Sequence, residues 1–142
     1  MSGINVSRLI IGGLLAGLAA NIGDFVSNAF FLADEMDMMR QRLGIDAATW
    51  ESNGALVTWI VADFILGFLI VLTYAAIRPR FGPGPTTAMT AGLVLYAAIT
   101  VVILGFAQMG IFTTEVVVKA GLFSLFNMMV ASLVGGWAYR EK

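Results

Sequence analysis

The chain has 142 residues, of which 59% are hydrophobic and only 12% are charged, and its mean hydropathy is +0.90. Soluble domains are roughly half apolar and about a quarter charged, so this composition predicts a membrane protein, with a single domain over residues 1–142. A formal net charge of −1 without a basic run argues against a nucleic-acid partner.

Cysteine and histidine are both missing from the sequence. For this chain alone, their absence excludes disulfides, iron–sulfur clusters, the usual zinc sites, His-ligated haem, and nucleophilic schemes built on Ser-His or Cys-His. We therefore expect no cofactor, no metal site and no catalytic residue, and we do not expect an enzyme.

Four apolar runs follow one another, each longer than the roughly 20 residues that a ~30 Å hydrocarbon core requires. They cover about residues 8–33, 54–77, 86–108 and 114–139. A signal peptide is the alternative for the first run, but its apolar residues continue past Asp24 to Leu32, which is too long for an h-region. The sequence therefore predicts an all-α membrane protein, a bundle of four transmembrane helices that includes a retained first helix.

The first run combines small and polar residues on one helical face. Steps of three or four residues connect Gly13, Gly17, Asn21, Asp24 and Asn28. Hydrocarbon does not accept a carboxylate and two amides without partners. We therefore expect this face to meet other helices or water.

The first loop, Asp34–Asn53, is long and acidic. Apolar residues recur at helical spacing in Asp34–Leu43, so this part is predicted to prolong the first helix or to form an interfacial turn that Gly44 ends. Asp46 fits the N-cap of a short interfacial helix that contains Trp50. Such a helix either caps the bundle, which we favour, or forms a docking surface outside the membrane.

The second loop, Arg78–Pro85, holds all three prolines and is predicted to be a stiff, non-helical connection. Its Arg78 and Arg80 either fix the topology or contact lipid phosphate or a partner. The third loop, around residues 110–113, is short, so the last two runs are expected to be antiparallel neighbours, with a threonine capping the last helix.

Charge is distributed unequally between the two ends that these runs define. One end has five basic residues and a single acid, Glu141, whereas the other end is predominantly acidic. The five basic residues are Arg8, Arg78, Arg80, Arg140 and Lys142. Positive-inside bias therefore predicts that both termini are cytoplasmic.

Two acids lie inside the apolar runs, and their positions predict similar depth. Asp24 lies as far before the end of the first run as Asp63 lies after the start of the second. Two neighbouring carboxylates in a low dielectric cannot both stay ionised cheaply, so one should take a proton or a cation should bridge them. Asn127 is expected to join this polar site, and Lys119 is expected to pair with one of the two acids or with Glu115, one turn before it.

Close helix packing is predicted at glycines on the inward faces of the runs. These glycines are Gly13, Gly17, Gly67, Gly121 and Gly135.

Three interpretations of the polar residues compete. In the first, acids and amides only bond helices together, with about 0.5–2 kcal/mol from each hydrogen bond. In the second, Asp24 and Asp63 form the proton or cation site of a small transporter or channel. In the third, the same acids act on lipid as acid and base, although no phosphate-binding glycine loop or nucleophile motif accompanies them.

Two runs, Ile11–Val26 and Leu72–Ala88, carry a resemblance to known proteins. A Gly/Ala-rich first helix with a polar second half, and a basic Pro/Gly-rich second loop, resemble a family of uncharacterised bacterial four-span inner-membrane proteins. The resemblance implies a bacterial cytoplasmic membrane and brings no activity, substrate or catalytic residue.

For function, the sequence favours association. We expect an accessory or scaffold subunit of a larger membrane complex or a homo-oligomer, with membrane lipids and other subunits as partners. The alternative is a proton- or cation-coupled transporter or channel that uses Asp24 and Asp63.

Overall fold

The computed structural model describes residues 4–139. In this part of the chain, helices follow one another without a strand between them. They are α1 (Val6–Val26), the π-helical turn η1 (Ser27–Phe31), α2 (Ala33–Arg42), α3 (Ala47–Trp50), α4 (Asn53–Phe81), α5 (Pro85–Gln108) and α6 (Thr114–Ala138).

Four helical segments of this described part are long and apolar enough to cross a membrane, which confirms the predicted all-α architecture. The segments are Val6–Phe31, Ala47–Phe81, Pro85–Gln108 and Thr114–Ala138. Three of these segments have nearly the predicted bounds, whereas the second extends beyond the predicted run 54–77 at both ends.

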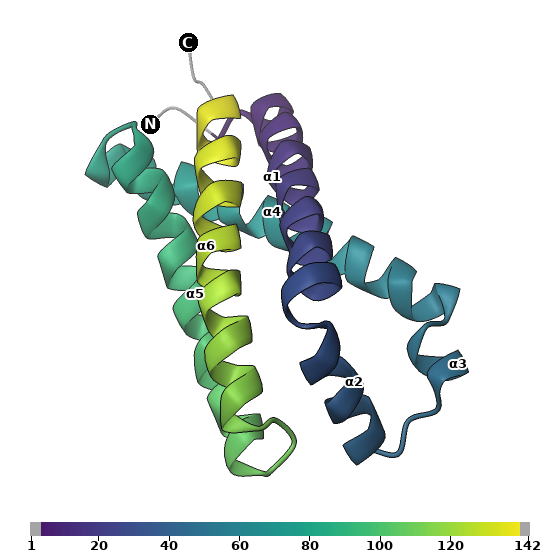
Figure 1. The fold of residues 1–142 in the computed structure, drawn as a ribbon. Coiled ribbons are helices and arrows are strands. Elements are labelled where there is room, and N and C mark those ends of the chain that lie inside the picture. The colour runs from purple at the N-terminus through teal and green to yellow at the C-terminus, as the bar shows by residue number, and fades with distance from the viewer. Residues whose placement is uncertain (1–3, 140–142) are drawn as a thin grey trace.

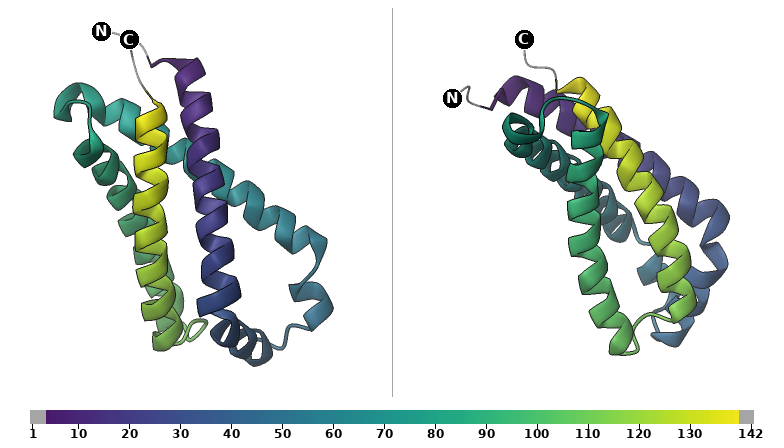
Figure 2. Two further views of the ribbon diagram at one scale, coloured as in Figure 1. Left: turned by 45° about the horizontal axis from the view of Figure 1, so that its top comes forward. Right: turned by 90° about the vertical axis from the view of Figure 1, so that its left-hand side faces the viewer.

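Helices α1 and α6 lie side by side, and α4 crosses behind them on its way to α5 (Figure 1). Helix α5 then pairs with α6, as the short third loop predicts (Figure 2). The start of α1 and the end of α6 meet, because the backbone N–H of Asn5 donates to the Tyr139 hydroxyl at 3.0 Å. We call this the basic end, because Arg8, Arg78 and Arg80 lie at it; the opposite end, with α2, α3 and the turn between α5 and α6, is the acidic end.

The backbones of α1 and α4 touch where these two helices cross. A Cβ atom on Gly67 would lie 2.6 Å from the Gly13 carbonyl oxygen and 2.7 Å from Gly17 Cα, so only glycine fits. Such backbone contact is typical of membrane helices, which associate through van der Waals packing rather than through a hydrophobic driving force.

The closed core occupies the half of the molecule nearer the basic end. Its fully buried residues include Ala16, Ile70, Val71 and Ala131, which are contributed by α1, α4 and α6. Toward the acidic end, the first half of α4 and the second half of α5 are covered with exposed apolar side chains. Those are Leu56, Val57, Trp59, Ile60 and Val61 on α4, and Val101, Val102, Leu104 and Phe106 on α5.

The prediction that Arg78–Pro85 is non-helical was wrong for its first half. Helix α4 continues through Pro79 to Phe81, and the connection shrinks to residues 82–84. Pro79 removes a single N–H in the last turn, and the helix still closes with a 2.8 Å bond from Gly82 N to the Arg78 carbonyl. Gly82 and Gly84 supply the positive φ angles of 81° and 144° that turn the chain into α5.

In the first loop, the stretch that was predicted to prolong the first helix or to form an interfacial turn is a separate helix. Helix α2 follows α1 after the π-turn, and Gly44 ends it with a φ of 68°. Asp46 then caps α3, because its carboxylate accepts from the backbone N–H of Thr49 at 2.8 Å. Of the basic residues used for the topology, Arg140 and Lys142 lie outside the described residues, together with Glu141.

Candidate functional site: a carboxyl pair inside the bundle

Three helices converge on the two acids of the apolar segments. Asp24 comes from α1 and Asp63 from α4, and their carboxyl groups lie within hydrogen-bonding reach of each other. The Asp63 residue is only 8% exposed. The structure therefore brings together the two acids whose equal depth the sequence predicted.

Asn127 of α6 completes this cluster. Its Nδ2 donates to Asp24 Oδ1 at 2.7 Å and to the backbone carbonyl of Ala20 at 3.0 Å. Gly23 lies directly against the amide group, where any Cβ atom would collide with it. The amide thus fixes α6 to α1 and holds one of the two carboxyl groups in place.

The other two asparagines of α1 serve the backbone rather than the carboxyl pair. Asn21 Nδ2 donates to the Gly17 carbonyl at 2.9 Å and to the Ile60 carbonyl of α4 at 3.3 Å. Asn28 is exposed, and its Nδ2 donates to the Asp24 carbonyl at 2.8 Å within the π-turn. Of the three predicted amides, Asn127 alone bonds to a carboxyl group in the described structure.

Lys119 does not reach the carboxyl pair. Its ammonium group binds Glu35 of α2 in a close ion pair and lies 3.2 Å from Glu115, one turn earlier on α6. The hydrogen bond from Lys119 holds the pKa of Glu35 below its usual range. The predicted pairing of Lys119 with Glu115 is therefore present, whereas pairing with Asp24 or Asp63 is absent among residues 4–139.

Neither Asp24 nor Asp63 forms a salt bridge within the described chain. Among residues 4–139, no group of three or more acidic, His or Cys side chains could hold a metal ion. Calcium and magnesium ions require six or more oxygen ligands. Two carboxyl groups supply too few of these, so several waters would have to complete the coordination shell. One shared proton removes one of the two negative charges of such a pair, and it needs no further ligand.

The two sides of the pair along the helices are packed differently. On the side of the basic end, the pair is followed by the α1–α4 crossing and by the buried residues Ala20, Ile70 and Met128. On the side of the acidic end, Asp24 is followed by η1, where the exposed Asn28 lies. Asp24 itself is only partly buried, whereas Asp63 is buried.

The remaining predicted residues lie elsewhere. Gly135 of α6 packs closely against Gly12 of α1, whereas Gly121 has more room and its carbonyl accepts from the Tyr96 hydroxyl at 3.0 Å. At the basic end, the Arg78 guanidinium lies over the Tyr139 ring, 5.9 Å from its centroid, and Arg80 is exposed.

No protein-family model, no curated protein and no solved structure matches this chain.

Sequence reasoning missed two residues of this region, Gly23 and Glu35. Gly23 directly precedes Asp24. Its position beside an intramembrane acid is the signal from which a close contact with a polar side chain of another helix could have been suspected. Glu35 could not be assigned, because its partner lies on a helix that is remote in sequence and meets α2 only after the chain bends at η1.

Proposed function

We propose that this chain is a small proton-translocating membrane protein whose Asp24–Asp63 pair binds and releases one proton within the membrane. The observation that carries the proposal is the contact between two carboxyl groups on different helices without a basic partner in the described chain. Intramembrane acids are costly, and those that lie close together commonly mark proton relays.

The proposal favours a proton over a metal cation because of the donor set. Asn127 turns its Nδ2 toward Asp24, so it adds a hydrogen-bond donor to the site rather than an oxygen ligand. A donor stabilises a carboxyl pair that shares one proton, whereas it repels a bound cation. In this proposal the proton enters from the acidic end, the side of the pair away from the packed α1–α4 crossing, and its release toward the basic end requires that crossing to loosen.

Proton flux into liposomes tests this proposal. Purified protein is reconstituted into phosphatidylethanolamine–phosphatidylglycerol vesicles that contain a pH-sensitive dye, and a potassium gradient with valinomycin drives proton entry. We expect faster internal acidification than in empty vesicles, and loss of this excess in Asp63→Asn and in Asp24→Asn.

The matched control is Asp34→Asn, which removes an exposed acid of α2 and should keep the wild-type flux. The proposal is wrong if the wild-type protein acidifies vesicles no faster than protein-free ones, or if both pair variants keep the full rate.

As a second candidate we propose association, as an accessory or scaffold subunit or a homo-oligomer. The supporting observation is that only 11% of the apolar membrane-spanning part of α5 is buried within the chain. Most of this helix is therefore available for contact with other helices or lipid. Crosslinking in native membranes followed by mass spectrometry tests it: a stoichiometric partner or a defined oligomer supports it, and recovery of the monomer alone contradicts it.

For location we propose a bacterial cytoplasmic membrane, with the basic end on the cytoplasmic side. The support is charge asymmetry: among residues 4–139, Arg8, Arg78 and Arg80 lie at one end without an acid, as positive-inside bias requires.

A further inference from the structure

Helix α2 and the turn η1 lie along the start of α6 and contact it at two successive positions. The Phe31 ring of η1 stacks on the Phe123 ring of α6, with the ring centroids 4.7 Å apart. One turn further along the chain, Glu35 of α2 binds Lys119, which lies one turn earlier on α6. The two contacts advance in opposite directions along the two segments, so α2 lies antiparallel to α6.

The side of this segment that faces α6 is buried, although it lies outside the closed core. Ser27 is 8% exposed, Leu32 is 4% exposed and Glu35 is 6% exposed. The π-turn keeps these residues on one side, because its bond from Leu32 N to the Ser27 carbonyl, at 2.9 Å, accommodates one residue more than an α-helical turn. Asn28 and Phe30, on the outer side of the turn, are exposed.

Ser27 marks the seam between α1 and α6 on the acidic side of the carboxyl pair. Before it along the chain, Asp24 accepts from Asn127 at 2.7 Å, and after it Phe31 stacks on Phe123. Both contacts join the first segment to α6, so Ser27 lies between them and is covered. We call this interval the α1–α6 seam. A water or proton that follows the seam from the acidic end to Asp24 must pass the stacked rings and Ser27.

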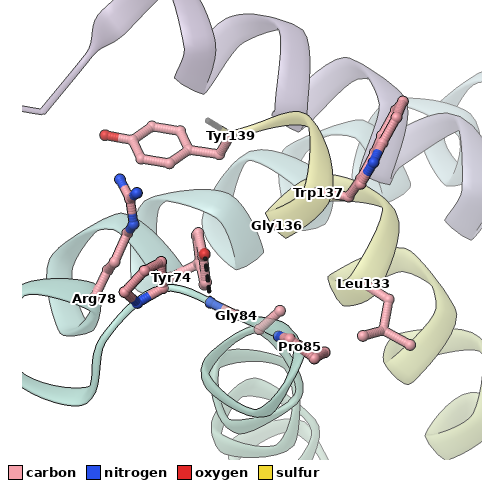
Figure 3. Close-up of a pocket in the computed structure, with 10 residues that line it drawn as sticks. Tyr74, Arg78, Gly84, Pro85, Leu133, Gly136, Trp137 and Tyr139 are labelled. Atoms are coloured by element: carbon pink, nitrogen blue, oxygen red, sulfur yellow. Dashed lines mark hydrogen bonds between the residues drawn. The ribbon is translucent and has the colours of Figure 1, made fainter. Parts of the chain in front are cut away.

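The opposite side of the pair is closed far more firmly. There the backbones of α1 and α4 touch at Gly67, and the buried Ile70 and Met128 fill the space toward the basic end. A cavity of about 590 Å³ opens only beyond this core, between the end of α4, the start of α5 and the end of α6 (Figure 3). Opening this side requires packed helices to separate.

The acidic side, in contrast, is held by side chains that can separate at little cost. Lys119 has a second acid, Glu115, at 3.2 Å on its own helix. Its ammonium group therefore keeps a partner when Glu35 leaves, and no buried cation is left without one. The carboxylate of Glu35 belongs to α2, at the acidic end, where departure from α6 exposes it to water.

We propose that η1 and α2 form a lid over the α1–α6 seam, which the Glu35–Lys119 ion pair holds shut, and that release of this lid admits protons to Asp24 and Asp63. Lids of this kind belong to the least stable parts of a fold, as the few side-chain contacts here require. This regulation rests on the proposed proton translocation, but the opening of the seam can be measured without it.

The reactivity of a thiol in the seam tests the lid by itself. The chain has no native cysteine, so Ser27→Cys supplies a single reporter of nearly the same size. Its rate of modification by a small water-soluble methanethiosulfonate is measured at constant pH in lipid nanodiscs, where both membrane faces are accessible. We expect Glu35→Gln to raise this rate about fivefold, the effect of losing one partly exposed ion pair.

Variants of the partner residues assign the effect to the ion pair. Lys119→Gln breaks the same contact from α6 and should raise the rate equally, whereas Lys119→Arg should keep the parent rate. Glu115→Gln, which leaves the Glu35 contact intact, is the matched control and should also keep it, all with unchanged helix content by circular dichroism. Equal rates in the parent and in both Glu35→Gln and Lys119→Gln overturn the lid, and so does an equal increase in Glu115→Gln.

A reversible lock tests whether the lid controls the carboxyl pair. The stacked rings place Phe31→Cys and Phe123→Cys within reach of a short bis-methanethiosulfonate crosslinker. In the liposome assay we expect the crosslinked double variant to acidify vesicles more slowly than the same protein after reduction. Phe31→Cys alone, treated identically, should show no such difference.

The outcomes separate the two proposals. If the reduced double variant translocates protons and the crosslinked form does so equally fast, the lid does not control the pair, and the proposed function stands. If the wild-type protein carries no proton flux, the proposed function is wrong and control by the lid is wrong with it.

Discussion

At the scale of a single residue, Asn127 has two roles. Its amide connects α6 to α1 through the Ala20 carbonyl, and it donates a hydrogen bond to Asp24, one carboxyl group of the pair. Hydrogen bonds between membrane helices contribute about 0.6 kcal/mol on average and up to about 1.7 kcal/mol. Two such bonds end on one buried amide here, and their loss would also leave Asp24 without its donor.

We therefore expect Asn127→Ala to lower the free energy of unfolding by about 1–2 kcal/mol, measured by titration with a denaturing detergent. Asn28→Ala is the control: its amide is exposed and bonds within its own turn, so the expected change is within about 0.5 kcal/mol. Equal effects of the two substitutions would contradict the role given to Asn127.

The pair of Glu35 and Lys119 predicts a pH dependence at the acidic end. Lys119 lowers the pKa of Glu35 below its usual 4.5, so the ionised form is the one that the folded chain stabilises. A lowered pKa means that this stabilisation is complete above pH 4.5 and is lost as the pH falls through the lower, folded-state pKa. Helix α2 should then detach from α6.

Spin labels at Met38→Cys and Val118→Cys, both exposed positions, report this contact as a distance distribution. We expect a narrow distribution at neutral pH that broadens well below pH 4.5, and a broad one at both pH values in Glu35→Gln. Glu115→Gln, which leaves the Glu35 contact intact, should behave like the parent. A width that is independent of pH would refute the coupling.

At the scale of single residues, the sequence predicted that the two acids lie at the same depth in the membrane. Asp24 and Asp63 flank the same loop at equal distances, so antiparallel helices had to bring them to one level. The partner of Lys119 could not be predicted, because it depends on the direction that α2 takes after the π-turn. The α-helical periodicity of α1 ends at η1, so the sequence pattern does not give the angle between α1 and α2.

At the scale of the helices, the close crossing of α1 and α4 depends on Gly67. A methyl group there would press into the backbone of Gly13 and Gly17, which cannot yield as a flexible side chain could. We expect Gly67→Ala to destabilise the folded state by about 1–3 kcal/mol, as overpacking does. Unfolding in detergent measures this loss.

Gly105→Ala is the matched control, because in the described structure no atom beyond its chain neighbours and its own helix backbone lies within 4 Å of the Cβ position at Gly105. It should be neutral, or stabilising by up to about 1 kcal/mol from helix propensity. The packing account fails if alanine is tolerated equally at both glycines.

The bounds of the helices were largely predictable, since apolar length and caps set them, as at Asp46. The end of α4 was not. Proline rules describe a helix in isolation, whereas α4 already has a long packed segment before Pro79 and needs only one more turn. The inclined course of α4 behind α1 and α6 was also unpredictable. It depends on how closely the two backbones approach at the glycine crossing, which the sequence pattern does not give.

At the scale of the whole molecule, the fold predicts one orientation in the membrane. Because the chain has no native cysteine, single-cysteine variants need no altered background. An impermeant maleimide added to intact cells should label Ala48→Cys in α3, and should label Ser7→Cys only after the membrane is opened. The reverse pattern would invert the topology, and labelling of both residues in intact cells would contradict a multi-pass arrangement with this loop outside.

The central claim is that Asp24 and Asp63 share one proton between packed helices, and infrared spectroscopy of the protein in lipid bilayers tests it most directly. A protonated carboxyl group has a C=O stretching band that is separate from those of carboxylates and amides. We predict such a band at neutral pH in the wild-type protein and in Asp34→Asn, and its loss or shift in Asp24→Asn and in Asp63→Asn. Absence of the band in the wild-type protein, or its persistence unchanged in both pair variants, would contradict the account.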